Sequence, residues 1–350
     1  MTIPALDGFR ALAIGFVIAS HVGLERVFPG QFGVTLFFFL SGYLITTLLR
    51  REVGRGGHID LPAFYRRRAV RILPPLYITF TFLLLMSALH LLRHINGQWL
   101  WADLLFLSNY LPLSAMPIGL WSLAVEEHFY LGFPLLLALL TRRFSFGRAA
   151  GTCLAVCALV LGVRLWEIAR GADLTGATIG VWTHTRIDSI LFGCVLALWN
   201  NPVADRDNVL PSGWRGYALA VTLLLPTFAI RDEAFRQSFR YTVQGFGLIV
   251  LFNTAIRDRV LAPIFLDNPI ARQVALYSYT LYLVHSGLIL MVARPDGSHP
   301  LLPTLVALVG AWLYAALMHR WVEKPMSRWR RARERAVREP LVGSPDLVGR

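Results

Sequence analysis

Long apolar stretches limit most strongly how this chain can fold, because they recur along nearly its whole length. A helix needs roughly 20 apolar residues to cross about 30 Å of hydrocarbon, and it satisfies its own backbone polar groups within the lipid. Hydrophobic residues fill 55% of the 350 positions and charged residues only 16%, which is unlike a water-soluble domain. The sequence therefore predicts an all-α fold, a polytopic membrane helix bundle.

About ten transmembrane helices are predicted, within one domain of residues 1–326. The segment 102–113 is apolar but contains Asn109 and Pro112, so we interpret it as an outer re-entrant or interfacial piece rather than a span. The spans at 186–199 and 215–230 are short. The ten predicted spans are 5–24, 33–50, 73–92, 117–140, 149–169, 186–199, 215–230, 239–256, 273–293 and 301–322.

Basic residues predict the orientation, because loops rich in Lys and Arg stay in the cytoplasm. With both the N-terminus and the C-terminus cytoplasmic, most of the 34 Lys and Arg residues fall in inner loops. The outer loop with Arg231, Arg236 and Arg240 fits this pattern least. Topology accounts for the net charge of +13, so nucleic-acid binding is not expected. Residues 327–350 are predicted to be a basic, disordered cytoplasmic tail attracted to membrane lipids.

Three ionisable residues lie in the first predicted span, where a charge costs several kcal/mol unless it is paired or faces water. At about 100° per residue, Asp7, Arg10 and His21 share one helix face. His21 lies about 16 Å from Arg10 toward the outer end, at a rise of 1.5 Å per residue. Such a stripe can line a channel. Alternatively, Asp7 and Arg10 form a surface pair and His21 caps the helix end.

Two adjacent carboxylates, Glu126 and Glu127, lie within the segment WSLAVEEHFYLGFP of the fourth span. Consecutive helical residues point about 100° apart, so one Glu can face a cavity in the bundle while the other meets a neighbouring helix. A carboxylate beside His21 would fix the imidazole tautomer and orient it as a general base. The alternative is a Glu held in a buried ion pair with Arg164 or Arg186.

The segment DLPAFYRRRAVRILPPLY between the second and third spans predicts a short helix. Asp60 is its candidate N-cap, and the proline pair beginning at Pro74 is expected to end or kink it. Arg67 and Arg68 each lie one turn from Arg71, so together they can bind phosphate groups bidentately. The preference for basic residues in cytoplasmic loops explains this patch equally well.

Neither a metal site nor a cysteine site is predicted. His90 and His94 have the i,i+4 spacing that lets two imidazoles meet one ion, but a third ligand is missing. Cys153, Cys157 and Cys194 fall in apolar spans, where a thiolate is unfavourable. We therefore expect no metal cofactor, no disulfide framework and no cysteine nucleophile.

Six segments follow one another along the chain. They are LDGFRALA with His21 downstream, FFFLSGYLIT from Phe37, YRRRAVRILPPLY from Tyr65, WSLAVEEHFYLGFP from Trp121, YSYTLYLVH from Tyr277 and HRWVEKPMSR from His319. In these segments, and in their order, the chain resembles the acyltransferase 3 family of bacterial membrane acyltransferases. The resemblance covers nearly the whole sequence.

The resemblance implies a multi-pass protein of the cell inner (cytoplasmic) membrane that transfers an acyl group, often acetyl. The donor would be cytoplasmic acyl-CoA, and the acceptor a hydroxyl of a glycan, a lipid-linked sugar or a small molecule. By the family pattern, Arg10 and His21 are a functional pair, Arg68 and Arg71 belong to the acyl-CoA site, and Glu126 is the motif acid. A stand-alone form without an SGNH esterase-like domain is also implied.

These considerations give one hypothesis about mechanism and one alternative function. His21 would take the proton from the acceptor hydroxyl, with Glu126 orienting or charge-balancing it, and a covalent acyl-enzyme stays open as another route. Ser41 is disfavoured as a nucleophile, because small residues at this point favour close helix packing. A transporter or flippase for an anionic solute or acylated lipid would also have ten spans and a polar bundle face. The predicted catalytic residues are His21, Glu126, Arg10 and Asp7, and the predicted acyl-CoA contacts are Arg67, Arg68 and Arg71.

Overall fold

The computed structural model describes residues 3–92, 95, 97–111, 119–174, 179–293 and 299–338. Within these ranges the regular structure is helical and contains no β-strand, so the all-α prediction is confirmed. Among the described residues, seven helical segments are long and apolar enough to cross a membrane. These segments are Pro4–Leu24, Gly30–Gly56, Leu61–Ala88, Leu120–Arg143, Phe146–Ala169, Pro269–Val292 and Leu301–Arg333.

Each of the ten predicted spans falls on a helix, and three of these helices are shorter or less apolar than the seven. These three, α8, α9 and α11, have 12, 17 and 19 residues. The α-helices are α1 (Pro4–Ala19), α2 (Gly30–Gly56), α3 (Leu61–Ala88), α4 (Leu100–Leu104), α5 (Leu120–Arg143), α6 (Phe146–Ala169), α7 (Thr183–Arg186), α8 (Asp188–Trp199), α9 (Gly213–Ala229), α10 (Glu233–Gln237), α11 (Phe239–Arg257), α12 (Leu261–Leu266), α13 (Pro269–Val292), α14 (Leu301–Met318) and α15 (Lys324–Arg338).

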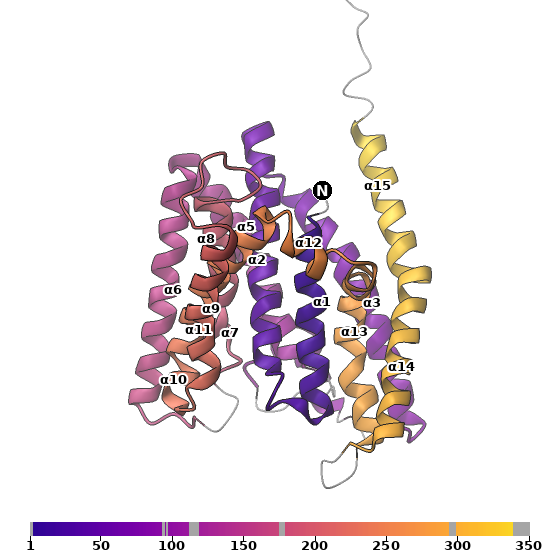
Figure 1. Ribbon diagram of the computed structural model, residues 1–350. Coiled ribbons are helices and arrows are strands. Elements are labelled where there is room, and N and C mark those ends of the chain that lie inside the picture. The colour runs from indigo at the N-terminus through magenta and orange to yellow at the C-terminus, as the bar shows by residue number, and fades with distance from the viewer. Residues whose placement is uncertain are drawn as a thin grey trace, which may run out of the picture.

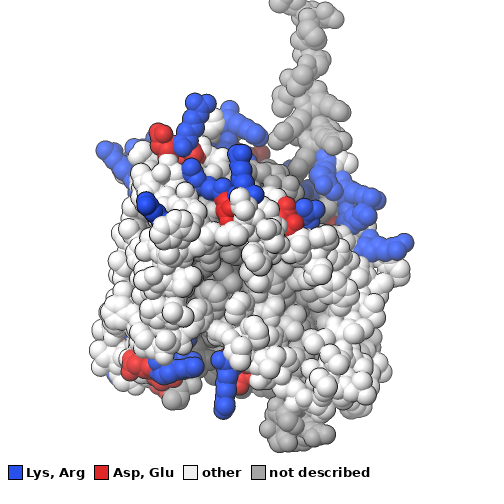
Figure 2. Space-filling view, viewed as in Figure 1, with Lys and Arg blue, Asp and Glu red and all other residues white. Residues whose placement is uncertain are grey.

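The long helices run side by side in one bundle (Figure 1). The N-terminus and the end of α15 lie at the same end of this bundle, at the top of the view, while α10 lies at the other end. Lys and Arg gather at the top, a few lie at the bottom, and the band between them is almost free of charge (Figure 2). An uncharged band between two charged ends is the surface that a membrane-spanning bundle requires. The more basic end is the one expected to face the cytoplasm.

Helix α8 explains why a predicted span can be so short. It is surrounded by α2, α6 and α11, and every residue from Asp188 to Leu198 is buried. Its contact with α2 depends on two glycines: a Cβ added to Gly42 would lie 1.9 Å from the Ile190 carbonyl oxygen, and one added to Gly193 would lie 2.1 Å from that of Phe39. The expectation that small residues at this point of the chain, next to Ser41, allow close helix packing is therefore confirmed.

The expectation of a separate short helix before the third span is wrong. Helix α3 begins after Asp60, whose side chain accepts a hydrogen bond from the Ala63 amide at 2.9 Å, and continues through Pro74 and Pro75. Two adjacent prolines remove two backbone donors, yet helices in a membrane bundle tolerate this when neighbouring groups satisfy the freed carbonyls. One continuous helix therefore carries the arginine segment directly into the bundle.

The structure describes only part of the two segments that were predicted not to span the membrane, residues 102–113 and 327–350. In the predicted interfacial piece, α4 is a five-residue helix followed by turns up to Leu111. Residues 327–338 of the predicted tail belong to helix α15. His94, Pro112 and residues 339–350 lie outside the described residues.

Candidate functional site

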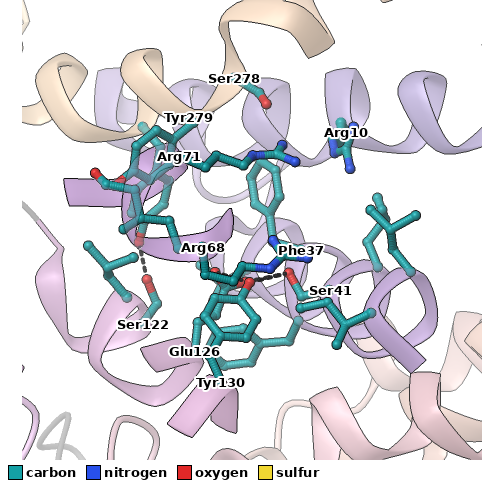
Figure 3. Close-up of a pocket in the computed structure, with 18 residues that line it drawn as sticks. Arg10, Phe37, Ser41, Arg68, Arg71, Ser122, Glu126, Tyr130, Ser278 and Tyr279 are labelled. Atoms are coloured by element: carbon teal, nitrogen blue, oxygen red, sulfur yellow. Dashed lines mark hydrogen bonds between the residues drawn. The ribbon is translucent and has the colours of Figure 1, made fainter. Parts of the chain in front are cut away.

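A cavity opens between α1, α2, α3, α5 and α13 (Figure 3) and contains about 880 Å³ of empty space, part of it open to solvent. Apolar side chains form much of its wall. Its ionisable lining residues comprise three arginines, one carboxylate and three tyrosines: Arg10, Arg68, Arg71, Glu126, Tyr130, Tyr279 and Tyr282. The cavity thus combines an excess of positive charge with hydroxyl groups in an otherwise apolar bundle.

The three arginines come from two helices and turn toward the same space (Figure 3). Arg10 of α1 forms an ion pair with Asp7 at 3.1 Å, as the i,i+3 spacing predicted. Arg68 of α3 lies over an aromatic ring, with its Cζ 5.0 Å from the centroid of Tyr130. Neither Arg68 nor Arg71 forms an ion pair with a carboxylate of the described residues. A phosphate group could therefore occupy donors that the protein leaves available.

Glu126 lies on α5 and is held by two hydroxyl groups. It accepts a hydrogen bond from Ser41 Oγ at 2.8 Å and another from the hydroxyl of Tyr130, one helical turn away, at 3.2 Å. The sequence predicted Glu126 beside His21, or else a glutamate paired with Arg164 or Arg186. The contacts are with Ser41 and Tyr130 instead, and Arg164 pairs with Asp188 at 2.7 Å.

His21 lies in the π-helical turn Ser20–Leu24 that follows α1. Its Nδ1 lies 2.8 Å from the carbonyl oxygen of Val17. A carbonyl only accepts hydrogen bonds, so Nδ1 must carry the proton, which leaves the lone pair of a neutral imidazole on Nε2. A backbone carbonyl, rather than Glu126, therefore sets the tautomer that a general base requires.

A second histidine lies against the first. The rings of His21 and His285 are 4.9 Å apart and nearly perpendicular. His285 is buried on α13, and its Nδ1 lies 2.9 Å from the carbonyl oxygens of Leu281 and Tyr282. The same reasoning places the His285 proton on Nδ1, and its buried Nε2 has no hydrogen-bond partner among the described residues.

Tyr282 connects the cavity with this histidine pair. Tyr282 lines the cavity. Its hydroxyl is hydrogen-bonded to Ser122 and donates to the Gly119 carbonyl oxygen at 3.0 Å. Its ring centroid is 5.8 Å from that of His285. The rings of Tyr282, His285 and His21 therefore form a continuous row from the cavity to the turn after α1. This turn lies at the end of the bundle opposite the termini (Figure 1).

The structure thus brings together four of the seven predicted site residues, Arg10, Arg68, Arg71 and Glu126, around one cavity. Asp7 adjoins it through Arg10, and His21 is reached through Tyr282 and His285. Arg67 does not line the cavity, and instead lies 3.4 Å from Glu52.

The residues predicted from the sequence did not include Tyr130, Tyr282, Ser122 or His285. A signal existed for one of them, because Glu126 and Tyr130 have the i,i+4 spacing at which helical side chains meet. The others depend on contacts between α5, α13 and the turn after α1, which no local pattern reveals. No group of three or more potential metal ligands occurs among the described residues.

Comparison with known proteins gives a consistent result. A family model described as "Acyltransferase domain" matches residues 3–320. The O-acetyltransferase OatA of Staphylococcus aureus (strain NCTC 8325 / PS 47) is 28% identical over 351 residues, covering 93% of this chain and 57% of OatA. A second S. aureus protein, from strain COL and also named as an O-acetyltransferase, is 31% identical over 358 residues with the same coverage. The chain thus spans just over half the length of these curated relatives. No solved structure matches it significantly.

Proposed function

Because this chain belongs to the acyltransferase 3 family, we propose that it transfers an acetyl group from acetyl-CoA to a hydroxyl of a glycan, a lipid-linked sugar or a small molecule. It is a multi-pass membrane protein. The observation that carries the proposal is the continuous row from a cavity lined by three arginines, through Tyr282 and His285, to His21. Such a row joins a phosphate-binding end to a base at the opposite end of the bundle.

Arg68 and Arg71 bind the phosphate groups of acetyl-CoA in this proposal, with Arg10 beside them. Among the described residues, no carboxylate lies within ion-pair distance of Arg68 or Arg71. This supports the assignment, since a charge-assisted hydrogen bond to an anion would replace contacts with water. The arginines of the cavity lie in the N-terminal parts of α1 and α3, toward the basic end that is expected to face the cytoplasm. The pantetheine arm would extend from there along the cavity toward Tyr282.

His21 acts as the general base. Its Nε2 removes the proton from the acceptor hydroxyl, and the oxygen attacks the thioester carbonyl carbon. An ester C–O bond forms, the C–S bond breaks, and CoA leaves as a thiolate that regains a proton from the imidazolium. The hydrogen bond between His21 Nδ1 and Val17 supports this role, because it leaves Nε2 ready to accept a proton.

Glu126 acts within the cavity in this proposal, rather than beside His21. Its hydrogen bonds hold the hydroxyls of Ser41 and Tyr130. Its negative charge offsets part of the positive charge of Arg68 and Arg71, which would otherwise repel one another across the same space.

The decisive experiment compares wild type with His21→Ala in detergent, measuring CoA release from acetyl-CoA with and without a hydroxyl acceptor. General-base assistance contributes about 10² to 10⁴ in rate, so His21→Ala should lose at least this factor and still bind acetyl-CoA. His21→Gln is the matched variant, since glutamine keeps a hydrogen bond but takes up no proton at neutral pH. A fully active His21→Gln enzyme would contradict the role of His21. Solute uptake without any CoA release would instead favour a transporter.

A further inference from the structure

A second cavity lies at the opposite end of the bundle from the termini, between the end of α1, the start of α2, and helices α9, α10 and α11. It contains about 890 Å³ of empty space, part of it open to solvent. Four arginines line it, two exposed (Arg26, Arg231) and two half-buried (Arg236, Arg240), with Glu25 as the one acidic lining residue among those described. Basic residues are disfavoured on the outer side of a membrane protein. This cluster therefore needs a reason other than topology.

The arginines of this outer cavity are only partly neutralised. Arg236 pairs with Glu233 at 2.5 Å. Arg26, Arg231 and Arg240 form no ion pair with the described residues. Arg240 donates a hydrogen bond to the hydroxyl of Tyr241 at 3.1 Å. The buried Nε of Arg240 has no hydrogen-bond partner among the described residues. The cavity is thus positively charged and has donors available for an anion.

Its remaining lining suits a molecule that carries hydroxyl groups as well as charge. Gln31 and Gln244 contribute amides, which both donate and accept hydrogen bonds. One wall is aromatic and consists of Phe16, Phe32 and Phe228. The ring centroid of Phe32 lies 5.6 Å from that of Phe16 and 4.9 Å from that of Phe228. A pocket that combines an apolar wall with a few convergent polar groups is typical of a small-molecule or glycan site.

The outer cavity and the histidine pair lie close along the chain but on different sides of α1. His21 and the lining residue Glu25 are four residues apart, a reach of at most about 14 Å. Phe16 lines the cavity, whereas the ring of His21 lies against His285 of α13, a helix that contributes no residue to the cavity lining. A molecule held in the cavity would reach His21 only if it extended around the end of α1.

We propose that the outer cavity binds the acceptor, and that the acceptor is an extended polyhydroxyl molecule carrying carboxylate or phosphate groups. That the bound molecule is an acceptor rests on the proposed transferase function. That the cavity binds an anion does not. The arginines would hold the charged groups, and a hydroxyl further along the molecule would meet His21.

Direct binding to the full chain in detergent tests the site without requiring turnover. The probes are trigalacturonic acid, which carries carboxylates, farnesyl phosphate, which carries a lipid-linked phosphate, and neutral galactotriose, all measured by isothermal titration calorimetry. Binding of the acidic sugar alone would identify a carboxylated glycan, and binding of farnesyl phosphate alone a phosphate-bearing lipid carrier. Binding of both would establish the shared anionic chemistry. If neither acidic probe binds, or if galactotriose binds equally well, the proposal is overturned.

The variant that separates this cavity from general surface charge is the double substitution Arg26→Gln and Arg231→Gln. Both side chains are exposed, so folding should be retained, and the thermal midpoint will verify this. We expect affinity for the acidic probe to fall about tenfold or more. The matched control is Arg170→Gln: Arg170 is exposed at the end of α6, stacks on Trp166 and does not line the cavity. Equal losses in both proteins would reduce the effect to nonspecific attraction.

A separate readout keeps this inference apart from the proposed function. Acetyl-CoA binding should be unchanged in the double variant, because its proposed site lies at the other end of the bundle. If the anion site is confirmed but wild type never releases CoA with an acceptor, the transferase proposal fails and the anion site stands. If CoA release is intact in the double variant with the acidic probe as acceptor, the site fails and the transferase proposal stands.

Discussion

Two groups of arginines lie inside this bundle, and their surroundings differ. Arg164 of α6 is fully buried and paired at 2.7 Å with the equally buried Asp188, and it also donates to the Thr185 carbonyl oxygen at 2.7 Å. Arg186 next to it stacks on Tyr241, with its Cζ 3.7 Å from the ring centroid. In the first cavity, by contrast, Arg68 and Arg71 have no carboxylate partner in the described part of the chain, and they border about 880 Å³ of empty space.

The comparison shows that a charge inside the membrane does not by itself identify a binding site. A fully buried ion pair is a structural element whose disruption costs stability. A guanidinium without a carboxylate partner that borders empty space can exchange water for a ligand. The predicted consequences are therefore different: substitutions in the closed group should affect folding, and substitutions around the cavity should affect binding.

The largest effect is expected for Asp188→Asn. Removing one member of a buried ion pair leaves the other charge uncompensated, at a cost of about 3 to 5 kcal/mol. The thermal midpoint in detergent, followed by tryptophan fluorescence, should fall sharply. Glu126→Gln is the matched variant, because the Gln amide keeps one oxygen that accepts a hydrogen bond, and its NH₂ group can donate to the other hydroxyl of the Ser41 and Tyr130 pair. Equal destabilisation by the two substitutions would erase the distinction between the closed pair and the cavity.

A smaller effect is expected for the cavity arginines, and on binding. A charge-assisted hydrogen bond contributes about 1.5 to 3 kcal/mol, so Arg68→Ala and Arg71→Ala should each weaken acetyl-CoA binding about tenfold or more. Arg142→Ala is the control, because Arg142 lies in the last turn of α5 and does not line the cavity. Titration of acetyl-CoA into each purified protein gives the dissociation constants. Comparable losses for all three substitutions would mean that the arginines attract acetyl-CoA only through overall charge.

The smallest effect is expected for Arg67→Ala. Arg67 lies 3.4 Å from Glu52, both side chains are partly exposed, and such pairs contribute about 1 kcal/mol or less. Its substitution should leave the acetyl-CoA dissociation constant unchanged and lower the thermal midpoint only slightly. A loss as large as that of Arg68→Ala would show that the phosphate site extends beyond the cavity lining.

Local sequence signals predicted several parts of the structure correctly. The Asp7–Arg10 pair and the cap at Asp60 involve residues three positions apart, where helical geometry alone decides the contact. The same local logic was wrong where it predicted a separate short helix before the third span, because α3 continues through Pro74 and Pro75 within the bundle. The short span at 186–199 is a buried helix, which its length did not reveal.

The sequence by itself determined that this is a polytopic helical membrane protein with the motifs of the acyltransferase 3 family. The length of an apolar stretch and the order of its residues are local properties, so they are readable without a fold. Only the tertiary structure decided the partners at the site. Glu126 meets Ser41 across 85 residues of sequence, and His21 meets His285 rather than Glu126. The rotation of each helix about its axis and the close approach of its neighbours set these contacts, and packing over the whole bundle fixes both.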